Sequence, residues 1–204
     1  MYKLFQRLPY FRGKMRLAKL IFKKNKPRTF FLPSGLVFSV PNLIENVSFE
    51  LFINGIYEEK YLKLIEKNLP LNSIFIDVGA NVGAISILLA KRRPDVTIYA
   101  FEASPRVFQY LKINKDQNAL VNLHIYNLAI HATDNLELPF YSPEGKNGKG
   151  SFSPVFTQNS ELVKTISLDT FFIQNNISPN FIKVDVEGYE SYVFIGGGGY
   201  DFKS

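Results

Sequence analysis

The stretch SIFIDVGANVG at residues 73–83 decides how this chain folds. Its first half is a short run of branched and aromatic residues, typical of a buried strand, and residues 84–91 continue with the apolar spacing of a helix. The Gly-x-Asn-x-Gly turn between them lets the backbone bend sharply and approach a ligand. Asp77 and the first N–H groups of the helix then meet at the carboxyl end of the strand, where open α/β sheets bind ligands. We therefore expect a small-molecule pocket with a carboxylate and unpaired amides.

The residues of this turn discriminate between ligands. A dinucleotide fingerprint needs glycine at its second position so that a pyrophosphate can lie on the backbone, but that position is Asn81. Asp77 would also repel phosphate and attract a cationic amino group. S-adenosylmethionine has such a group and no phosphate, and Glu102, at the end of the next strand (residues 96–102), is placed to accept hydrogen bonds from both of its ribose hydroxyls. A nicotinamide-dinucleotide oxidoreductase and a tight turn without a ligand are the alternatives.

Four segments in a fixed order resemble the signatures of the FkbM family of S-adenosylmethionine-dependent methyltransferases. They are FIDVGANVG at 75–83, FEASP at 101–105, TISLDTF at 165–171 and IKVDVEGYE at 182–190, and Tyr57-Glu58 upstream also fits the family pattern. The resemblance implies a Rossmann-like class I methyltransferase fold, α/β with a mostly parallel sheet. It also implies O-methylation of a hydroxyl on a saccharide, glycolipid or related metabolite. Ala103-Ser104 departs from the pair that is commoner in the family.

With this resemblance, we expect a set of residues at three strand ends to bind S-adenosylmethionine. The set is Asp77, Gly79, Ala80, Asn81, Gly83, Glu102, Ala103 and Asn127. Asn127 ends a third strand, at residues 121–127, which by its position faces adenine and offers a side-chain amide to the base. His124 in the same strand alternates with apolar residues, which favours packing over catalysis.

A second strand–turn–helix pattern, at residues 181–190, supplies carboxylates for catalysis. In a parallel sheet this fourth strand neighbours the first, which brings Asp185 and Glu187 to the same rim as Asp77. A hydroxyl acceptor must lose its proton, and a positioned carboxylate can accept that proton or orient the acceptor. The structural alternative is that one carboxylate caps the following helix while the other holds the loop. Magnesium between the two acids and a substrate diol is a further option, but two acids are a thin basis and we expect no metal.

The composition is that of one ordinary globular domain. The chain has 204 residues, 46% hydrophobic and 21% charged, which is enough for a substantial core. The absence of cysteine excludes disulfides, thiolate metal ligands and a cysteine nucleophile, and two histidines are too few for a histidine-rich metal site. No apolar run is long enough to span a bilayer and no signal peptide is evident, so a cytoplasmic location is the default expectation.

The net charge of +6 is concentrated near the N-terminus. Residues 1–28 hold 10 of the 24 basic residues and none of the 18 acidic ones, so the remainder has 14 basic residues and a net charge of −4. A mildly acidic body argues against nucleic acid running across it. Residues 14–24 can form a basic amphipathic helix that makes a peripheral contact with an anionic membrane. A helix packed on the domain with solvated lysines is an equal alternative, and RNA binding is a weaker one.

We expect three segments along the chain: a basic amphipathic segment at 1–28, a hairpin and cover helix at 29–70, and the S-adenosylmethionine-binding domain at 71–204. In the second segment, apolar runs flank a Pro-Ser-Gly turn, and Asn54 is positioned to cap a helix that ends near residue 68. In the third, Ser104-Pro105 favours the start of a helix and residues 136–141 an added strand. Residues 142–160 are interpreted as an acceptor-side loop or, equally, as a plain surface loop.

The segment after the fourth strand is short. Glu187 is followed by 17 residues, whereas one further strand–helix–strand unit needs roughly 30. We therefore expect the sheet to lack its last strands, which leaves the fourth strand as an exposed edge prone to self-association. A non-catalytic or fragmentary cofactor-binding domain is the alternative to an active methyltransferase that acts on a small hydroxylated acceptor.

Overall fold

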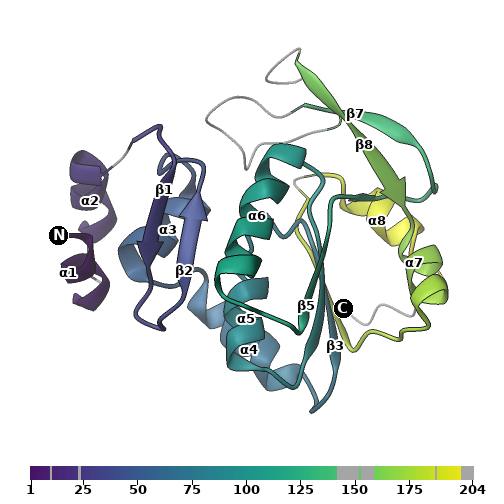
Figure 1. Cartoon of the computed structure of the whole chain (residues 1–204), viewed down its shortest axis with the longest axis horizontal. Coiled ribbons are helices and arrows are strands. Elements are labelled where there is room, and N and C mark those ends of the chain that lie inside the picture. Colours follow the sequence, from purple (N-terminus) through teal and green to yellow (C-terminus); the bar gives the residue numbers. More distant parts are fainter. Residues whose placement is uncertain (10, 23, 142–151, 153–158, 187, 199–204) are drawn as a thin grey trace.

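The computed structural model describes residues 1–9, 11–22, 24–141, 152, 159–186 and 188–198. Its centre is a four-stranded sheet in the order β5-β4-β3-β9, in which all neighbouring strands are parallel (Figure 1). The strands are β3 (Ile74–Val78), β4 (Thr97–Phe101), β5 (Leu123–Tyr126) and β9 (Phe181–Val184). The predicted Rossmann-like α/β sheet is confirmed, and so is the prediction that the fourth strand neighbours the first. β9 lies at one edge of the described sheet, and self-association through it stays a prediction.

Helices cover both faces of this sheet (Figure 1). They are α5 (Ser86–Arg92) and α6 (Pro105–Gln117) on one face, and α7 (Leu168–Asn175) and α8 (Glu190–Ile195) on the other. α6 begins where the sequence predicted, because Ser104 is its N-cap and accepts a hydrogen bond from the N–H of Val107 at 3.4 Å. Pro105 follows at the first helical position, which needs no N–H.

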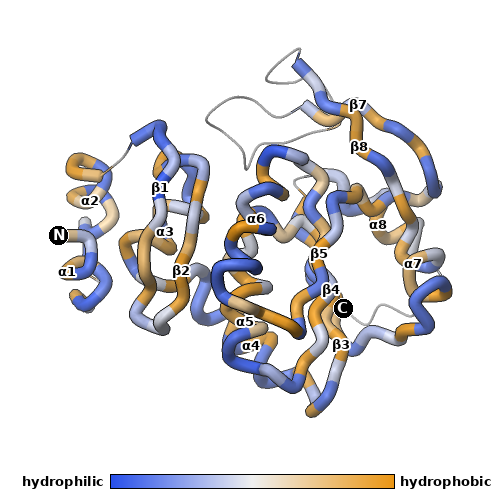
Figure 2. The backbone as a smooth tube through the Cα atoms, in the orientation of Figure 1, coloured by the Kyte–Doolittle hydropathy of each residue, from blue (hydrophilic) through white to orange (hydrophobic). Residues whose placement is uncertain are grey.

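The pleat of the strands divides their side chains between two cores. Phe75 and Ala100 lie in the cluster beneath α5 and α6, whereas Ile76 and Phe101 lie in the cluster beneath α7 and α8. Successive residues of a strand point to opposite faces, so an apolar run without alternation is buried on both sides. Figure 2 shows the hydrophobic residues along the central strands and along the helices beside them.

The hairpin and cover region differs from its prediction in one respect. β1 (Arg28–Phe31) and β2 (Val37–Val40) form the predicted antiparallel hairpin. The prediction of a single cover helix is wrong, because this region contains two helices, α3 (Asn46–Asn54) and α4 (Glu59–Asn68). Gly55 ends α3 with φ 73°, and a Cβ there would lie 2.5 Å from Cδ of Pro33. Asn54 therefore ends one helix instead of capping the next.

The N-terminal segment forms two short helices at one end of the molecule (Figure 1), α1 (Tyr2–Arg7) and α2 (Lys14–Phe22). Phe5 and Ala18 are buried in the same hydrophobic cluster as Phe75 of the central sheet. All three predicted segments thus contribute to one continuous core. Their boundaries at residues 28 and 70 stay a prediction. None of the helices in the described ranges combines the length and the apolar character needed to cross a bilayer.

A second, smaller sheet has the order β6-β8-β7. Its strands are β6 (Ala129–Ile130), β7 (Glu137–Tyr141) and β8 (Ser160–Ile166). β7 is the added strand that the sequence predicted, and it pairs antiparallel with β8. Of the expected acceptor-side loop, residues 142–151 and 153–158 lie outside the described residues.

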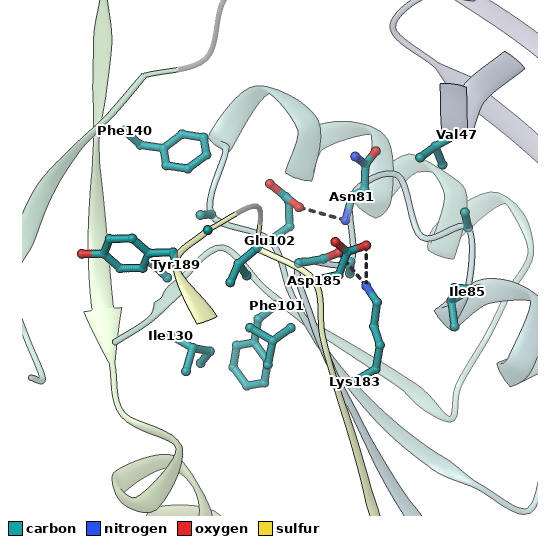
Figure 3. Close-up of a pocket in the computed structure, with 18 of the residues that line it drawn as sticks. Val47, Asn81, Ile85, Phe101, Glu102, Ile130, Phe140, Lys183, Asp185 and Tyr189 are labelled. Carbon is teal, nitrogen blue, oxygen red and sulfur yellow. Dashed lines mark hydrogen bonds and ion pairs between the residues drawn. The ribbon is translucent and has the colours of Figure 1, made fainter. Parts of the chain in front are cut away.

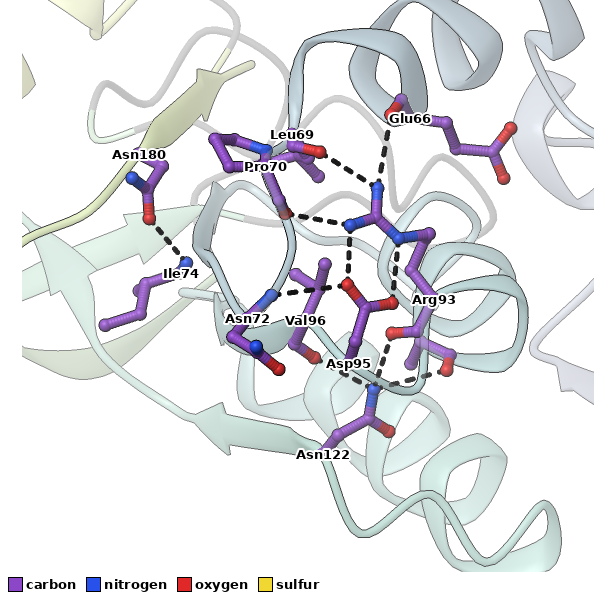
Figure 4. Close-up of polar contacts among 11 residues, drawn as sticks. Glu66, Leu69, Pro70, Asn72, Ile74, Arg93, Asp95, Val96, Asn122 and Asn180 are labelled. Atoms are coloured by element: carbon purple, nitrogen blue, oxygen red, sulfur yellow. Dashed lines mark hydrogen bonds and ion pairs between the residues drawn. The ribbon is translucent and has the colours of Figure 1, made fainter.

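The amino ends of the central strands are joined by a polar network (Figure 4). Arg93 binds Asp95 through two hydrogen bonds of 2.8 and 2.6 Å and also donates to the carbonyls of Leu69 and Pro70. The side-chain amide of Asn122 donates to three further carbonyls. These bonds tie the loops that enter β3, β4 and β5 to one another.

Candidate active site

A cavity of about 490 Å³ opens at the carboxyl ends of β3, β4 and β9 (Figure 3). This is the edge where open α/β sheets bind ligands, and the volume lies in the usual range for small-molecule sites. Among the residues predicted for the site, six line this cavity: Gly79, Ala80, Asn81, Glu102, Ala103 and Asp185. Asp77, Gly83 and Asn127 do not line it, and Glu187 lies outside the described residues.

The two glycines of the turn serve different purposes. Gly79 has φ 79°, and a Cβ there would lie 2.0 Å from the carbonyl oxygen of Asp185. Gly83 has φ 87°, and a Cβ there would lie 2.6 Å from Ile87 and 2.7 Å from Leu111. Gly79 therefore lets the ends of two strands touch, whereas Gly83 lets α5 pack against α6. The predicted contact of Gly83 with the cofactor does not match this placement, because Gly83 does not line the cavity.

The amides of the turn are already hydrogen-bonded within the protein. The N–H groups of Gly79 and Ala80 donate to the carbonyl of Phe101 at 3.0 and 2.9 Å, and the N–H of Asn81 donates to Glu102 Oε2 at 2.8 Å. The next two N–H groups donate to acceptors inside the turn itself. The expectation of unpaired amides is therefore wrong, because the turn closes onto the neighbouring strand β4 and onto itself.

Glu102 is held rigidly on the cavity wall. It is 8% exposed, its Oε1 accepts from the N–H of Ser104 at 2.9 Å and its Oε2 from the N–H of Asn81. Burial raises the pKa of Glu102 to about 7, although both backbone hydrogen bonds oppose this. Each carboxylate oxygen can accept more than one hydrogen bond, so both oxygens keep capacity for a diol.

Asp77 lies beneath the cavity floor instead of in its wall. It is fully buried, accepts a hydrogen bond from the hydroxyl of Ser86 and forms an ion pair of 2.9 Å with Nζ of Lys183. The expected direct contact between Asp77 and the amino group of the cofactor does not match this geometry, because both carboxylate oxygens already have partners. Asp77 instead neutralises a buried cation directly below the turn.

Lys183 is a central residue that the sequence analysis missed. Its Nζ also donates to the carbonyl of Gly79 at 3.0 Å and lies 3.8 Å from Oδ2 of Asp185. Burial lowers the pKa of Lys183, but the carboxylate of Asp77 outweighs this and the pKa is raised overall. The available signal was a lysine in an otherwise apolar strand, since a buried cation needs an acidic partner.

Asp185 is the acid that faces the open part of the cavity. Its side chain is 63% exposed, and its backbone N–H donates to the carbonyl of Val78, which continues the pairing of β9 with β3. The backbone N–H of Gly188 donates to Glu190 at 3.1 Å, which closes the turn before α8, and the N-cap of that helix, Tyr189, makes no side-chain capping bond. Within the described ranges, no three His, Cys, Asp or Glu side chains are grouped to hold a metal ion.

Asn127 stabilises the loop that carries Glu102. Its side-chain Nδ2 donates to the carbonyls of Glu102 and Ala103 at 2.8 and 3.0 Å. Both amide hydrogens are thus bonded to the backbone, so the predicted amide contact with adenine does not match the structure. Asn127 is a positioning residue for Glu102 and Ala103.

Two further walls of the cavity contain residues that the sequence indicated only weakly or not at all. Tyr57 and Glu58 come from the turn between α3 and α4, where Glu58 has an uncommon φ of 44°. Burial and then the nearby charges of Glu58 and Asp185 raise the pKa of Tyr57 well above its usual range. On another side, Phe140 and Tyr189 form an aromatic wall beside Glu102 (Figure 3).

The aromatic wall includes Phe152, which lies between Phe140 and Tyr189. Its ring centroid is 5.1 Å from that of Phe140 and 4.4 Å from that of Tyr189. The cavity therefore has an apolar, aromatic side and an acidic side with Glu58 and Asp185. An acidic rim, a rigid buried carboxylate and an apolar wall fit a cationic ligand with a diol and a flat ring, which describes S-adenosylmethionine.

A family comparison bears directly on this site. The Methyltransferase FkbM domain matches residues 77–204, which include the turn, Glu102 and Asp185. The chain belongs to the FkbM methyltransferase family. It therefore carries an S-adenosylmethionine-dependent methyltransferase domain, as the sequence predicted, and the alternative of a nicotinamide-dinucleotide oxidoreductase is excluded.

Two relatives extend this finding. Hexuronic acid methyltransferase AglP of Haloferax volcanii is 30% identical over 142 residues, which cover 68% of this chain and 56% of AglP. Methyltransferase 1 of Beauveria bassiana is 24% identical over 174 residues, which cover 75% of this chain and 67% of that protein. This chain thus spans little more than half of the length of AglP.

Solved structures with related folds match more weakly. TYW2 of M. jannaschii in complex with AdoMet is 23% identical, with a TM-score of 0.38 over 52% of this chain and 44% of that one. Coclaurine N-methyltransferase bound to N-methylheliamine and SAH is 14% identical, with a TM-score of 0.37 over 67% of this chain and 36% of that one. Similarities of this size add nothing to the family assignment.

Proposed function

We propose that this protein transfers a methyl group from S-adenosylmethionine to a hydroxyl oxygen of a saccharide, glycolipid or related metabolite. The observation that carries the proposal is the cavity itself, which places Glu102 and Asp185 on its walls at the ends of two strands that both flank β3. The name of the relative AglP, a hexuronic acid methyltransferase, supports an acceptor of the sugar class.

The residues at the end of β4 hold the donor. S-adenosylmethionine supplies a methyl group activated by its positive sulfur when it is bound. Glu102 accepts hydrogen bonds from the ribose hydroxyls, since its two backbone donors fix the carboxylate and leave it further acceptor capacity. Ala103 beside it leaves room for the base, and the acidic rim of Glu58 and Asp185 attracts the positive ligand.

Asp185 accepts the proton of the acceptor hydroxyl or orients that hydroxyl. Its side chain is exposed to the cavity, and Lys183 beside it approaches at 3.8 Å from below. Tyr57 also lines the cavity, where burial raises its pKa, and its ring and hydroxyl bound the space left for the acceptor. The backbone contact at Gly79 fixes the end of β9 against the turn, so these groups are aligned without a large rearrangement.

The charge of the cavity favours a neutral acceptor over one with a carboxylate. Glu58 and Asp185 line the acidic side, and the cation beneath, Lys183, is already paired with Asp77. A hexuronic acid offers both hydroxyl and carboxylate oxygens, and this wall would repel the carboxylate. The aromatic wall can cover the apolar C–H face of a sugar ring.

The experiment is a methyl-transfer assay that compares neutral hexoses, their lipid-linked forms and the matching uronic acids as acceptors. Transfer to a neutral sugar hydroxyl, with uronic acids at least about tenfold poorer, is expected from the charge of the wall. Calorimetry with S-adenosylhomocysteine runs in parallel and measures the donor site alone. Binding of this product without transfer to any hydroxylated acceptor would contradict the proposal and favour a non-catalytic cofactor-binding domain.

The role of Asp185 is tested with Asp185→Asn and a matched control, Asp116→Asn. Both aspartates are partly exposed, at 63% and 55%, but Asp116 lies on the surface of α6 and pairs with Lys112. We expect Asp185→Asn to lower kcat by about a hundredfold or more while the affinity for S-adenosylhomocysteine changes little. Asp116→Asn should behave as the unchanged protein. An unaltered kcat in Asp185→Asn would remove this residue from the reaction.

A further inference from the structure

Helix α2 has apolar side chains on two opposite faces. Ala18 is fully buried, and Met15 and Phe22 pack against the core on the same inner side. On the outer side, Leu17 and Leu20 are 47% and 86% exposed, and Ile21 is exposed as well. Positions 17, 20 and 21 share one face of a helix, so these side chains form a second apolar stripe. An ordinary surface helix has one such stripe, directed at the core.

Helix α1 and the turn after it add further exposed apolar side chains at the same end of the molecule. Leu4 is 60% exposed, and Leu8 and Phe11 are also exposed. Nζ of Lys14, at the start of α2, donates to the carbonyl of Leu8 at 2.9 Å, which ties the two helices together. We call Leu4, Leu8, Phe11, Leu17, Leu20 and Ile21 the outer stripe. It lies at the end of the molecule beyond the β1–β2 hairpin (Figure 1), and Figure 2 shows the hydrophobic stretches of α2 there.

Cations surround the outer stripe. Residues 1–28 contain ten basic residues and no acidic residue. The exposed ones include Lys3, Arg7, Arg12, Arg16, Lys19, Lys24, Lys26 and Arg28. The structure thus combines the two alternatives raised by the sequence, because one face of α2 packs on the domain and the other presents leucines among lysines and arginines. Packing on the core therefore leaves the outer stripe unexplained.

We propose that the outer stripe and its surrounding cations dock this protein on the surface of an anionic lipid bilayer. The leucines would insert at the boundary between headgroups and acyl chains, while the lysines and arginines reach the lipid phosphates. Nucleic acid would satisfy the cations but not the leucines. A second copy of the chain would bring ten cations against ten cations, which disfavours a symmetric protein contact. This inference does not depend on the proposed methyl transfer.

The test is co-sedimentation of the full chain with phosphatidylcholine vesicles, with and without phosphatidylserine. Binding is expected only to the anionic vesicles, and it should fall as salt is raised because the Debye length shortens. Leu17→Gln/Leu20→Gln should lower the partition coefficient by about tenfold or more, since each buried leucine contributes strongly to insertion. The matched control is Leu71→Gln/Val121→Gln, which changes residues that are 79% and 89% exposed outside the N-terminal segment. It should bind as the unchanged protein.

Each other outcome overturns the proposal. No binding to anionic vesicles would remove the docking surface. Binding that is unchanged in Leu17→Gln/Leu20→Gln would show adsorption by charge alone, without insertion of the outer stripe. A dimer in the absence of lipid, measured by analytical ultracentrifugation and abolished by the same variant, would assign the stripe to self-association. Thermal melting confirms that both variants are folded before these outcomes are compared.

Discussion

The two ends of the central sheet use the same kinds of charged residue for opposite purposes. At the amino ends, Arg93 and Asp95 bind each other and nearby backbone carbonyls (Figure 4). At the carboxyl ends, Glu102 is fixed by backbone N–H groups and Asp185 remains open to a cavity (Figure 3). The charged residues at the amino ends hold neighbouring loops together, whereas those at the carboxyl ends present carboxylate oxygens to the cavity.

The pKa values of the two ends move in opposite directions. Hydrogen bonds from Arg93 lower the pKa of Asp95 to about 2, whereas burial raises the pKa of Glu102 to about 7. A lowered carboxyl pKa marks a charge that the folded protein stabilises, and a raised one marks a charge that folding disfavours. A carboxyl group whose pKa is raised by burial in the wall of a cavity, as at Glu102, is a candidate functional group. The difference therefore separates a structural end from a functional one.

The largest expected effect comes from Glu102→Gln. We expect the affinity for S-adenosylhomocysteine to fall about a hundredfold or more, because the ribose hydroxyls lose a charged acceptor. Isothermal titration calorimetry measures this. The control is Glu66→Gln at the other end of the sheet, where Glu66 contacts Arg92 at 3.4 Å, and it should leave the affinity unchanged. Equal affinities in the two variants would mean that Glu102 does not hold the ribose.

The second prediction concerns the amino end. Arg93→Met should lower the free energy of unfolding by about 1–3 kcal/mol, because several backbone carbonyls and Asp95 lose a charged donor. The neighbouring Arg92→Met, which removes a surface ion pair, should cost about 0.5 kcal/mol or less. Urea titration provides both values. A loss of cofactor affinity in Arg93→Met without loss of stability would contradict the division between the two ends.

The smallest expected effect is a pH dependence that belongs to the cavity end. Because the folded pKa of Glu102 is raised, the folded protein binds more protons than the unfolded chain between about pH 4.5 and pH 7, so stability should fall as pH rises through this window. Asp95 titrates far below it and adds no slope there. Across the folded pKa, affinity for S-adenosylhomocysteine should rise about five- to tenfold from pH 6 to pH 7.5 as Glu102 ionises. Glu102→Gln should flatten both curves, and slopes that persist in that variant would assign them to another group.

Local patterns in the sequence correctly predicted the four parallel strands and the placement of the fourth beside the first. Short apolar runs such as 74–78, each followed by a turn and a helix, carry their own signal of burial on both faces. Asn54 misled because an asparagine before a helix and an asparagine at the end of one look alike. Gly55, the next residue, ends the helix in a left-handed conformation and packs closely against Pro33, so Asn54 is the last residue of α3.

The details of the site could not be predicted because they depend on contacts between distant residues. Asp77 was correctly placed at a strand end, but its partner Lys183 is more than a hundred positions away. Nothing near Asp77 indicates that its charge is already neutralised. Similarly, the amide of Asn127 binds the backbone near Glu102, a preference that follows from how two loops meet. Residue types at strand ends locate a site, but they do not show which side chains face it.

The contact between Gly79 and Asp185 constrains how such an enzyme can be altered. The backbone at residue 79 touches the carbonyl of residue 185, so no larger side chain fits without moving β9 away from β3. The carboxyl ends of β3 and β9 are thereby joined at a point where a larger side chain does not fit. Under the proposed function, directed evolution toward another acceptor should therefore leave this junction alone and vary the outer walls, at Tyr57 or Phe152, so that β3 and β9 keep their contact.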